Sequence, residues 1–199
     1  MNAINKLRNG LRIEFEISLL MVKVTVGIVC FFALSIFPDP GYCQNQSGTV
    51  TIVAKDEPGK KLIVKGRVQL PDGEPVAGAQ IWVFQTDVEG YYKKSESGGD
   101  LGWREARISK VFTAGPNGEF QIHTIRPGGY PGRALPEHIH FRISTSEIEE
   151  QEHTIFFADD KRVTDSFKSR IQRDDRLYLV DLKTDDDYLV GKFNLVFDL

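Results

Sequence analysis

The sequence predicts an all-β fold, an antiparallel β-sandwich with long functional loops. From about residue 50 onward, short runs rich in β-branched and aromatic residues alternate with turns that contain Gly, Pro and Asn. This spacing is typical of a sandwich. The composition, 41% hydrophobic and 27% charged, is that of a soluble globular domain. One segment, residues 165–173, is predicted to form a short helix.

The strands are expected at residues 49–54, 61–70, 79–85, 108–113, 119–125, 138–144, 153–157, 176–182 and 192–198. The turn Pro116-Asn117-Gly118 supplies the positive-φ positions that a tight hairpin needs. Two longer segments are predicted loops: residues 89–105 are polar and glycine-rich, and residues 126–137 hold three prolines and three glycines. Loops of this length inside a compact domain are usually functional.

Residues 1–43 are predicted to be a secretory signal peptide. A basic start precedes a 14-residue apolar run over residues 24–37, and prolines and a glycine follow it. This is the layout of an export signal, and the run is short for a membrane span. Cleavage after Cys43 would release a domain of residues 44–199 that is secreted or periplasmic. Contact with a membrane would then be transient, through the signal peptide alone.

Removing this segment changes the chemistry that is expected of the rest. Cys30 and Cys43 both leave with it, so any metal site in the mature domain would use His, Tyr, Asp or Glu. The segment holds four basic and three acidic side chains, so the net charge changes from −3 to −4. An acidic domain argues against nucleic acid as a partner.

Two alternatives to a cleaved signal peptide are left open: a retained membrane anchor over residues 17–37 and a lipoprotein attached through Cys43.

Two of the four histidines lie next to each other on a predicted strand, as His138-Ile139-His140. Alternate residues of a strand share a face, so His138 and His140 project together while Ile139 faces the interior. Paired imidazoles are natural metal ligands. Such a pair on a strand is more often ordinary surface or core, so the histidines alone do not establish a metal site.

The two predicted loops add tyrosine side chains. Tyr130 stands between a glycine and a proline in the second loop, and Tyr91 and Tyr92 follow Gly90 in the first. Each tyrosine could simply be an amphipathic surface residue. A phenolate, however, is a hard anionic ligand that suits a trivalent ion, and a bound cation lowers the pKa of tyrosine far below its usual value of about 10.

In these segments the sequence resembles the intradiol ring-cleavage dioxygenases, the family that includes protocatechuate 3,4-dioxygenase and catechol 1,2-dioxygenase. The matching segments are GRVQLPDGEPVAGAQIWVFQTDVEGYY (66–92), TAGPNGEFQIHTIRPGGYP (113–131) and EHIHF (137–141), with a further match at 193–199. The opening of the first segment occurs in many sandwich modules. The ordered set of a Gly-x-Tyr loop, Thr-Ile-x-Pro-Gly-x-Tyr-Pro and His-Ile-His is specific to the family.

The resemblance implies a non-haem Fe(3+) ion held by Tyr92, Tyr130, His138 and His140. It implies that a catecholic substrate displaces the axial Tyr130, which then acts as a base, while Tyr92 and His140 remain equatorial and His138 axial. The implied reaction cleaves the ring between the two hydroxylated carbons, incorporates both atoms of O2 and gives a muconate-type diacid. Relatives often assemble, so a homo-oligomer is left open.

The sequence departs from the family at two positions near the site. Leu135 stands where familiar members carry an arginine that stabilises negative charge on the substrate, and Arg133 is the candidate replacement. Thr154 stands where members carry a glutamine. Arg104 and Arg126 are further cations that could meet a carboxylated substrate, although solvated surface arginines are the simpler interpretation. These departures imply altered substrate choice or reduced activity.

Other functions compete with the dioxygenase interpretation. A cupin-type enzyme would need a glutamate shortly after His140, where Ser144 and Thr145 stand, so it is discounted. A secreted, non-catalytic sandwich of the transthyretin-like or carboxypeptidase-regulatory-like kind would bind protein or glycan without a metal. A dioxygenase-like protein that binds iron with little activity lies between the two.

Overall fold

The structure is a computed structural model that describes residues 48–198. The predicted signal peptide, residues 1–43, lies outside the described residues, so cleavage after Cys43 and export stay predictions. Within the part of the chain that the structure describes, no helix is both long and apolar enough to cross a membrane.

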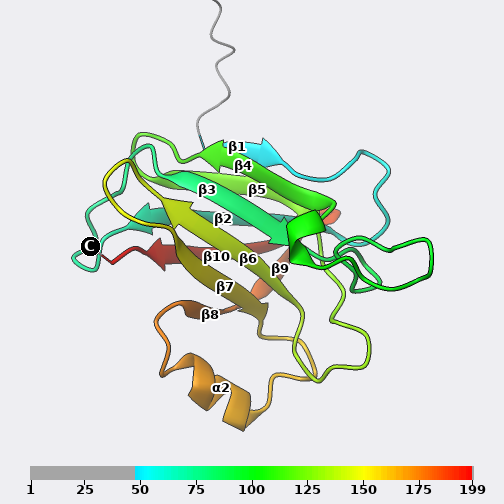
Figure 1. The fold of residues 1–199 in the computed structure, drawn as a ribbon. Coiled ribbons are helices and arrows are strands. Elements are labelled where there is room, and N and C mark those ends of the chain that lie inside the picture. Colours follow the sequence, from blue (N-terminus) through cyan, green and yellow to red (C-terminus); the bar gives the residue numbers. More distant parts are fainter. Residues whose placement is uncertain (1–47, 199) are drawn as a thin grey trace, which may run out of the picture. The chain divides into compact units, whose positions relative to one another are not determined.

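The chain forms strands with one short α-helix and one 3-10 turn. In chain order the elements are β1 (Thr49–Thr51), β2 (Lys61–Gln69), β3 (Gln80–Gln85), η1 (Trp103–Glu105), β4 (Ile108–Thr113), β5 (Glu119–Ile125), β6 (His138–Ser144), β7 (Gln151–Phe157), α2 (Asp165–Ile171), β8 (Leu177–Val180), β9 (Leu182–Asp185) and β10 (Tyr188–Val196). They build two five-stranded sheets, with strand orders β1-β5-β2-β10-β9 and β4-β3-β6-β7-β8 (Figure 1). The predicted all-β sandwich is confirmed.

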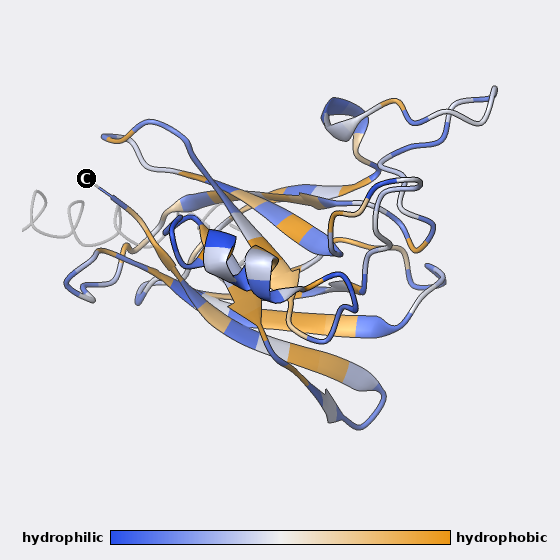
Figure 2. Ribbon diagram, turned by 90° about the horizontal axis from the view of Figure 1, so that it is seen from below, coloured by the Kyte–Doolittle hydropathy of each residue, from blue (hydrophilic) through white to orange (hydrophobic). Residues whose placement is uncertain are grey.

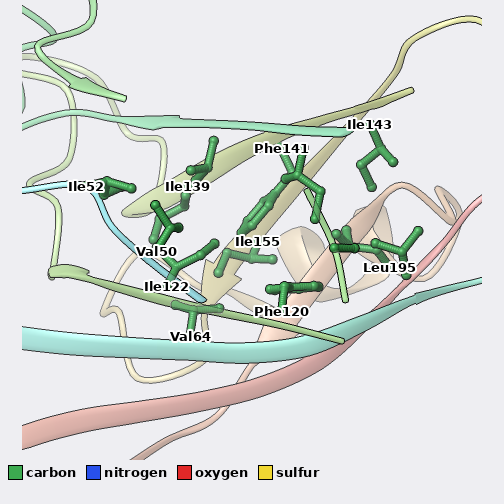
Figure 3. Close-up of a cluster of buried hydrophobic side chains, with 14 of the residues drawn as sticks. Val50, Ile52, Val64, Phe120, Ile122, Ile139, Phe141, Ile143, Ile155 and Leu195 are labelled. Carbon is green, nitrogen blue, oxygen red and sulfur yellow. The ribbon is translucent and has the colours of Figure 1, made fainter. Parts of the chain in front are cut away.

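The core lies between the two sheets and follows from the alternation of residues along the strands. Val64 of β2 faces inward from the first sheet, and Ile139, Phe141 and Ile143 of β6 face inward from the second (Figure 3). Burying each such side chain contributes about 1.5–3 kcal/mol. Apolar residues follow the strands, whereas the connecting loops and α2 are largely hydrophilic (Figure 2). The same alternation turns the neighbouring side chains of β6 outward.

The sheets differ from the sequence prediction in their connections. They are mixed, because β1–β5, β2–β10 and β7–β8 pair in parallel. The segment expected as one strand at residues 176–182 forms β8 and β9, which belong to different sheets. The turn at Pro116 to Gly118 also crosses between sheets, so the predicted hairpin is wrong, although Gly118 has the expected positive φ of 70°. Local periodicity predicts a strand but not the strand with which it pairs.

His153 is a polar side chain in the interior of the sandwich. It pairs in register with Phe141 and is 1% exposed. Its Nδ1 lies 3.3 Å from the hydroxyl of Tyr178, and its Nε2 has no hydrogen-bond partner among the described residues. Burial, assisted by the charge of Arg176, lowers the pKa of His153 to about 4, although Asp198 and two further aspartates oppose the shift. The imidazole is therefore neutral at pH 7.

This buried histidine is expected to make the fold less stable in mild acid. The unfolded chain titrates near 6.5 and the folded one near 4, so the unfolded state binds more protons between these values. The stabilisation is complete above pH 6.5 and is lost as the pH falls toward 4. Between pH 7 and pH 4.5, the free energy of unfolding should fall by roughly 2 kcal/mol more in the wild type than in His153→Gln.

Urea unfolding of the two metal-free proteins at both pH values measures this difference. His138, whose pKa is also lowered, titrates in both proteins and cancels from the comparison. An equal pH dependence of the wild type and the variant would contradict the prediction.

Candidate metal centre

The outer face of the second sheet carries the two predicted histidines. His138 and His140 lie on β6 and point away from the core, while Ile139 between them is fully buried, as predicted. Loops cover this face, so His138 is only 4% exposed. The ring of His140 stacks almost parallel on Phe84 of β3, with ring centres 4.8 Å apart. The strand alternation thus places both imidazoles at one site.

The loop after β3, residues 86–107, carries Tyr92. Two aspartates hold its irregular backbone. Asp87 Oδ1 accepts the backbone N–H of Tyr91 at 3.1 Å, and Asp100 Oδ1 accepts those of Tyr92 at 3.1 Å and Gly102 at 3.2 Å. Such carboxylate caps replace the ladder bonds that a loop lacks. They hold Tyr92 with its side chain turned inward, and the residue is 5% exposed.

The loop before β6, residues 126–137, carries Tyr130. Arg126 clamps the two ends of this loop, because its Nε donates to Glu137 Oε2 at 2.6 Å and its terminal nitrogens donate to Asp159 at 2.7 and 2.9 Å. The buried carboxylate of Asp160 accepts the Glu137 N–H at 2.7 Å. The backbone is therefore anchored directly before His138.

The two loops touch where the sequence has glycines. Gly90 has a φ of 89°, and a Cβ added to it would lie 2.2 Å from the carbonyl oxygen of Gly129. A Cβ on Gly128 would lie 2.4 Å from the carbonyl oxygen of Val88. Hydrogen bonds close the same contact, since Thr86 Oγ1 donates to Gly128 O at 2.7 Å. Only residues without a Cβ allow this approach, which brings the two tyrosine loops together.

All four predicted ligands meet beneath these loops. The hydroxyl of Tyr130 is hydrogen-bonded to that of Tyr92 and lies 3.1 Å from His138 Nε2. The ring centres of His138 and His140 are 4.8 Å apart, and those of Tyr92 and His140 are 6.5 Å apart. Side chains that are up to 48 positions apart in the sequence therefore form one cluster.

The hydrogen bonds determine where the protons of the cluster lie. His138 Nδ1 is 2.7 Å from the carbonyl oxygen of Pro136, which can only accept, so Nδ1 carries the proton. Nε2 then presents its lone pair to the hydroxyl of Tyr130, and Tyr92 donates in turn to Tyr130. Burial and the charge of His140 lower the pKa of His138 to about 4. Burial raises the pKa of both Tyr92 and Tyr130, and the hydrogen bond to Tyr130 raises that of Tyr92 further.

This donor set fits a ferric ion. Two phenol oxygens and two imidazoles combine hard, potentially anionic ligands with nitrogen donors that suit iron. Both phenol protons would have to leave on binding, so metal uptake would release protons. Within residues 48–198 no group of three or more His, Cys, Asp or Glu side chains gathers in the manner of a metal site. The cluster described here takes two of its four donors from tyrosine.

His140 has two oxygen partners on β7. Thr154 Oγ1 lies 3.2 Å from Nδ1 of His140, and Glu152 Oε1 lies 3.3 Å from the same atom. Thr154, which stands where family members carry a glutamine, lies on β7 next to β6 and faces the site. Sequence reasoning missed Glu152. The predicted strand began at residue 153, whereas β7 begins at Gln151, so Glu152 was not expected to share a face with Thr154.

A pocket of about 380 Å³ opens beside the cluster. Tyr92, Tyr130 and the candidate residue Arg133 line it, together with Asp100 and Trp103, which sequence reasoning did not single out. The Arg133 guanidinium lies 5.7 Å from the centre of the Tyr130 ring. Among the residues that line the pocket, Arg133 is the one with a guanidinium group, and its function as a replacement for the family's arginine stays a prediction.

The other candidate cations lie elsewhere. Arg126 is paired with carboxylates, and Arg104 stacks on Trp103 at 4.3 Å from the ring centre. Neither is among the residues that line the pocket. Leu135 also lies outside that lining.

Comparison with known sequences places the chain among dioxygenases. A family model described as "Dioxygenase" matches residues 39–198. The chain is 29% identical over 124 residues to hydroxyquinol 1,2-dioxygenase of a Rhizobium species. The aligned segment covers 54% of this chain and 41% of that protein. The chain is 31% identical over 125 residues to 6-chlorohydroxyquinol 1,2-dioxygenase of Cupriavidus pinatubonensis, covering 55% and 44%. The matches thus span less than half the length of these relatives.

Solved structures share the fold. The dioxygenase domain of a dioxygenase and carbohydrate-binding protein fusion from a Streptomyces species superposes with a TM-score of 0.60 at 23% identity, over 81% of this chain and 95% of that one. Catechol 1,2-dioxygenase from an Acinetobacter species gives a TM-score of 0.59 at 20% identity, over 75% and 56%. The family model covers most of the sequence, including both tyrosine loops and the histidine strand, and the chain belongs to the intradiol ring-cleavage dioxygenase family.

Proposed function

We propose that this protein is a non-haem Fe(III) intradiol dioxygenase. It would cleave a catecholic ring with O2 between the two hydroxylated carbons and release a muconate-type diacid. One observation carries the proposal: Tyr92, Tyr130 and His138 form a hydrogen-bonded chain beside His140, and a pocket opens onto both tyrosines. Relatives that match the chain are named as 1,2-dioxygenases of hydroxyquinol and catechol.

Tyr92, Tyr130, His138 and His140 would hold the ferric ion. When bound, the ion supplies Lewis acidity toward the two substrate oxygens and makes the ring reactive toward O2. The two tyrosines differ in burial, since Tyr92 is 5% exposed whereas Tyr130 is more open. Both phenols line the pocket, and Tyr130 is the one more accessible to a substrate. Its oxygen, once deprotonated, is placed to take the proton of a substrate hydroxyl at the pocket.

The remaining pocket residues bind and orient the ring. Tyr91 and Trp103 offer aromatic surface to a planar substrate. Arg133 places a permanent positive charge at the pocket, where it would stabilise negative charge on a bound catecholate.

O2 uptake by the Fe(III)-loaded full chain tests the proposal. Catechol, protocatechuate and hydroxyquinol should be offered in turn, with ¹⁸O2 to follow the oxygen atoms into the product. We expect one O2 to be consumed per ring cleaved, with both labelled atoms in the diacid, for at least one of these substrates. Iron binding without O2 uptake on any of them would refute the enzyme. It would favour the second candidate, an iron-binding protein of little activity, which the leucine at position 135 suggests.

Replacing Arg133 by glutamine is expected to lower kcat/KM. A hydrogen bond or charge contact to an ionised partner contributes about 1.5–3 kcal/mol, which corresponds to a loss of roughly 10- to 100-fold. Steady-state O2 uptake measures the loss, and the visible spectrum of the iron-loaded protein should not change. Arg104→Gln is the matched control, because Arg104 stacks on Trp103 outside the pocket lining. Equal losses in both variants would contradict a specific function for Arg133.

A further inference from the structure

A carboxylate that the proposed function does not use lies against one of the metal-binding histidines. Glu152 of β7 pairs in register with Arg142, and His140 pairs with Thr154. All four side chains therefore share the outer face of the sheet. Glu152 Oε1 is 3.3 Å from His140 Nδ1, the ring nitrogen that also has Thr154 Oγ1 at 3.2 Å. Both neighbours are oxygen atoms that can accept, and only the glutamate brings a charge.

Arg142 holds this carboxylate in place. Its Nε and one terminal nitrogen lie 3.0 and 2.9 Å from Glu152 Oε2, which leaves Oε1 directed to His140. The guanidinium itself is stacked 4.2 Å from the ring centre of Trp103, in the loop that carries Tyr92. A continuous chain of contacts therefore runs from this loop through Trp103, Arg142 and Glu152 to His140.

We propose that Glu152 is a positioning residue for the metal centre, acting on iron through His140. An acceptor at Nδ1 keeps the proton on that nitrogen, fixes the ring orientation and leaves the Nε2 lone pair for a metal. A negatively charged acceptor also makes the imidazole a stronger donor. The inference rests on the proposed function, because it presupposes that His140 binds the ion.

If Glu152 served only to stabilise the fold, its removal would lower the stability of the metal-free protein, and its surroundings argue against this. Its side chain is 44% exposed, and ion pairs at such sites contribute little to folding. Removing it should therefore leave the metal-free fold almost unchanged. Glu150 supplies a matched control, because it pairs with the same arginine at 3.2 Å and is 50% exposed. Among the ion pairs of the described residues, Glu152 contacts Nδ1 of His140, whereas Glu150 contacts only Arg142.

The experiment compares Glu152→Ala, Glu152→Gln and Glu150→Ala in the full chain. Fe(III) affinity is measured by following the tyrosinate-to-iron absorption in competition with nitrilotriacetate, and the Tm of each metal-free protein is recorded. We expect Glu152→Ala to weaken Fe(III) binding by about 10- to 100-fold, as outer ligand contacts typically do, with the metal-free Tm unchanged. Glu152→Gln keeps an acceptor oxygen and should recover part of the affinity. Glu150→Ala should bind within about twofold of the wild type.

Two outcomes separate the claims. If the wild type takes up no Fe(III), the proposed function fails and the inference falls with it. If the wild type binds iron and Glu152→Ala binds it within about twofold, or if Glu150→Ala loses as much, the inference alone is overturned.

Discussion

Phenylalanine at position 92 is expected to abolish ferric binding and, with it, ring cleavage. The substitution Tyr92→Phe removes one of the two phenol oxygens of the cluster. Residues that only contact a ligand typically change metal affinity by about 10- to 100-fold, so loss of the ligand itself should exceed about 100-fold. Metal content after gel filtration and the visible spectrum both measure this loss.

The fold of this variant should survive. Tyr92 packs against Phe84, with ring centres 6.1 Å apart, and the phenylalanine ring keeps that contact. The hydroxyl of Tyr92 is hydrogen-bonded to the hydroxyl of Tyr130, which keeps its second hydrogen bond, to His138, in the variant. The metal-free Tm of the variant should therefore stay close to that of the wild type, and a large drop would indicate misfolding.

Tyr91→Phe is the matched control. Tyr91 is the neighbouring tyrosine and lines the pocket, but it takes no part in the hydrogen-bonded cluster. This variant should keep its iron and its colour. If Tyr92→Phe retains the tyrosinate band, or if Tyr91→Phe loses it, the ligand assignment is wrong.

Of the substitutions proposed for this protein, Gly90→Ala is expected to cause the largest fall in the free energy of unfolding. Its φ of 89° is strained for any residue with a Cβ, and the new Cβ would meet the carbonyl oxygen of Gly129 at 2.2 Å. Left-handed backbone strain costs about 1–3 kcal/mol, and overpacking costs a similar amount. We expect the free energy of unfolding to fall by about 2–4 kcal/mol in denaturant melts of the metal-free protein.

The same substitution should also damage the site. Relief of the clash requires the loop with Tyr92 to move away from the loop with Tyr130, so Fe(III) affinity should fall as well. Gly99→Ala is the control in the same loop, since a Cβ there meets Ser95 Oγ at an ordinary 3.5 Å. It should change stability by no more than about 0.5 kcal/mol. Equal stability of the Gly90 and Gly99 variants would show that the two loops do not depend on this contact.

Local patterns were enough to predict where several strands begin and end, although β7, which contacts the site, begins two residues before its predicted start. The bounds of β4, β5 and β6 agree with the sequence prediction, because alternating apolar residues bounded by turn residues mark a half-buried strand. The partners of the strands could not be predicted in this way. Parallel pairing of β2 with β10 depends on residues more than a hundred positions apart, and no local signal specifies it.

The four residues of the cluster could be predicted from sequence motifs, but the carboxylates that hold the loop of Tyr92 and contact His140 could not. The glycines beside Tyr92 and Tyr130 signalled special backbone, and the structure shows that they mark the contact between two loops. Asp100 and Glu152 were missed because their functions arise from where the fold places them. A carboxylate in a charged segment looks like ordinary solvated surface until the neighbouring strand is known.

The visible absorption spectrum of the full chain, loaded with Fe(III) and freed of excess metal, tests the central claim most directly. If Tyr92, Tyr130, His138 and His140 hold a ferric ion, the protein must be coloured by a tyrosinate-to-iron charge-transfer band, and that band must shift when a catechol is added. A protein that stays colourless and retains no Fe(III) would contradict the metal centre and the function proposed for it.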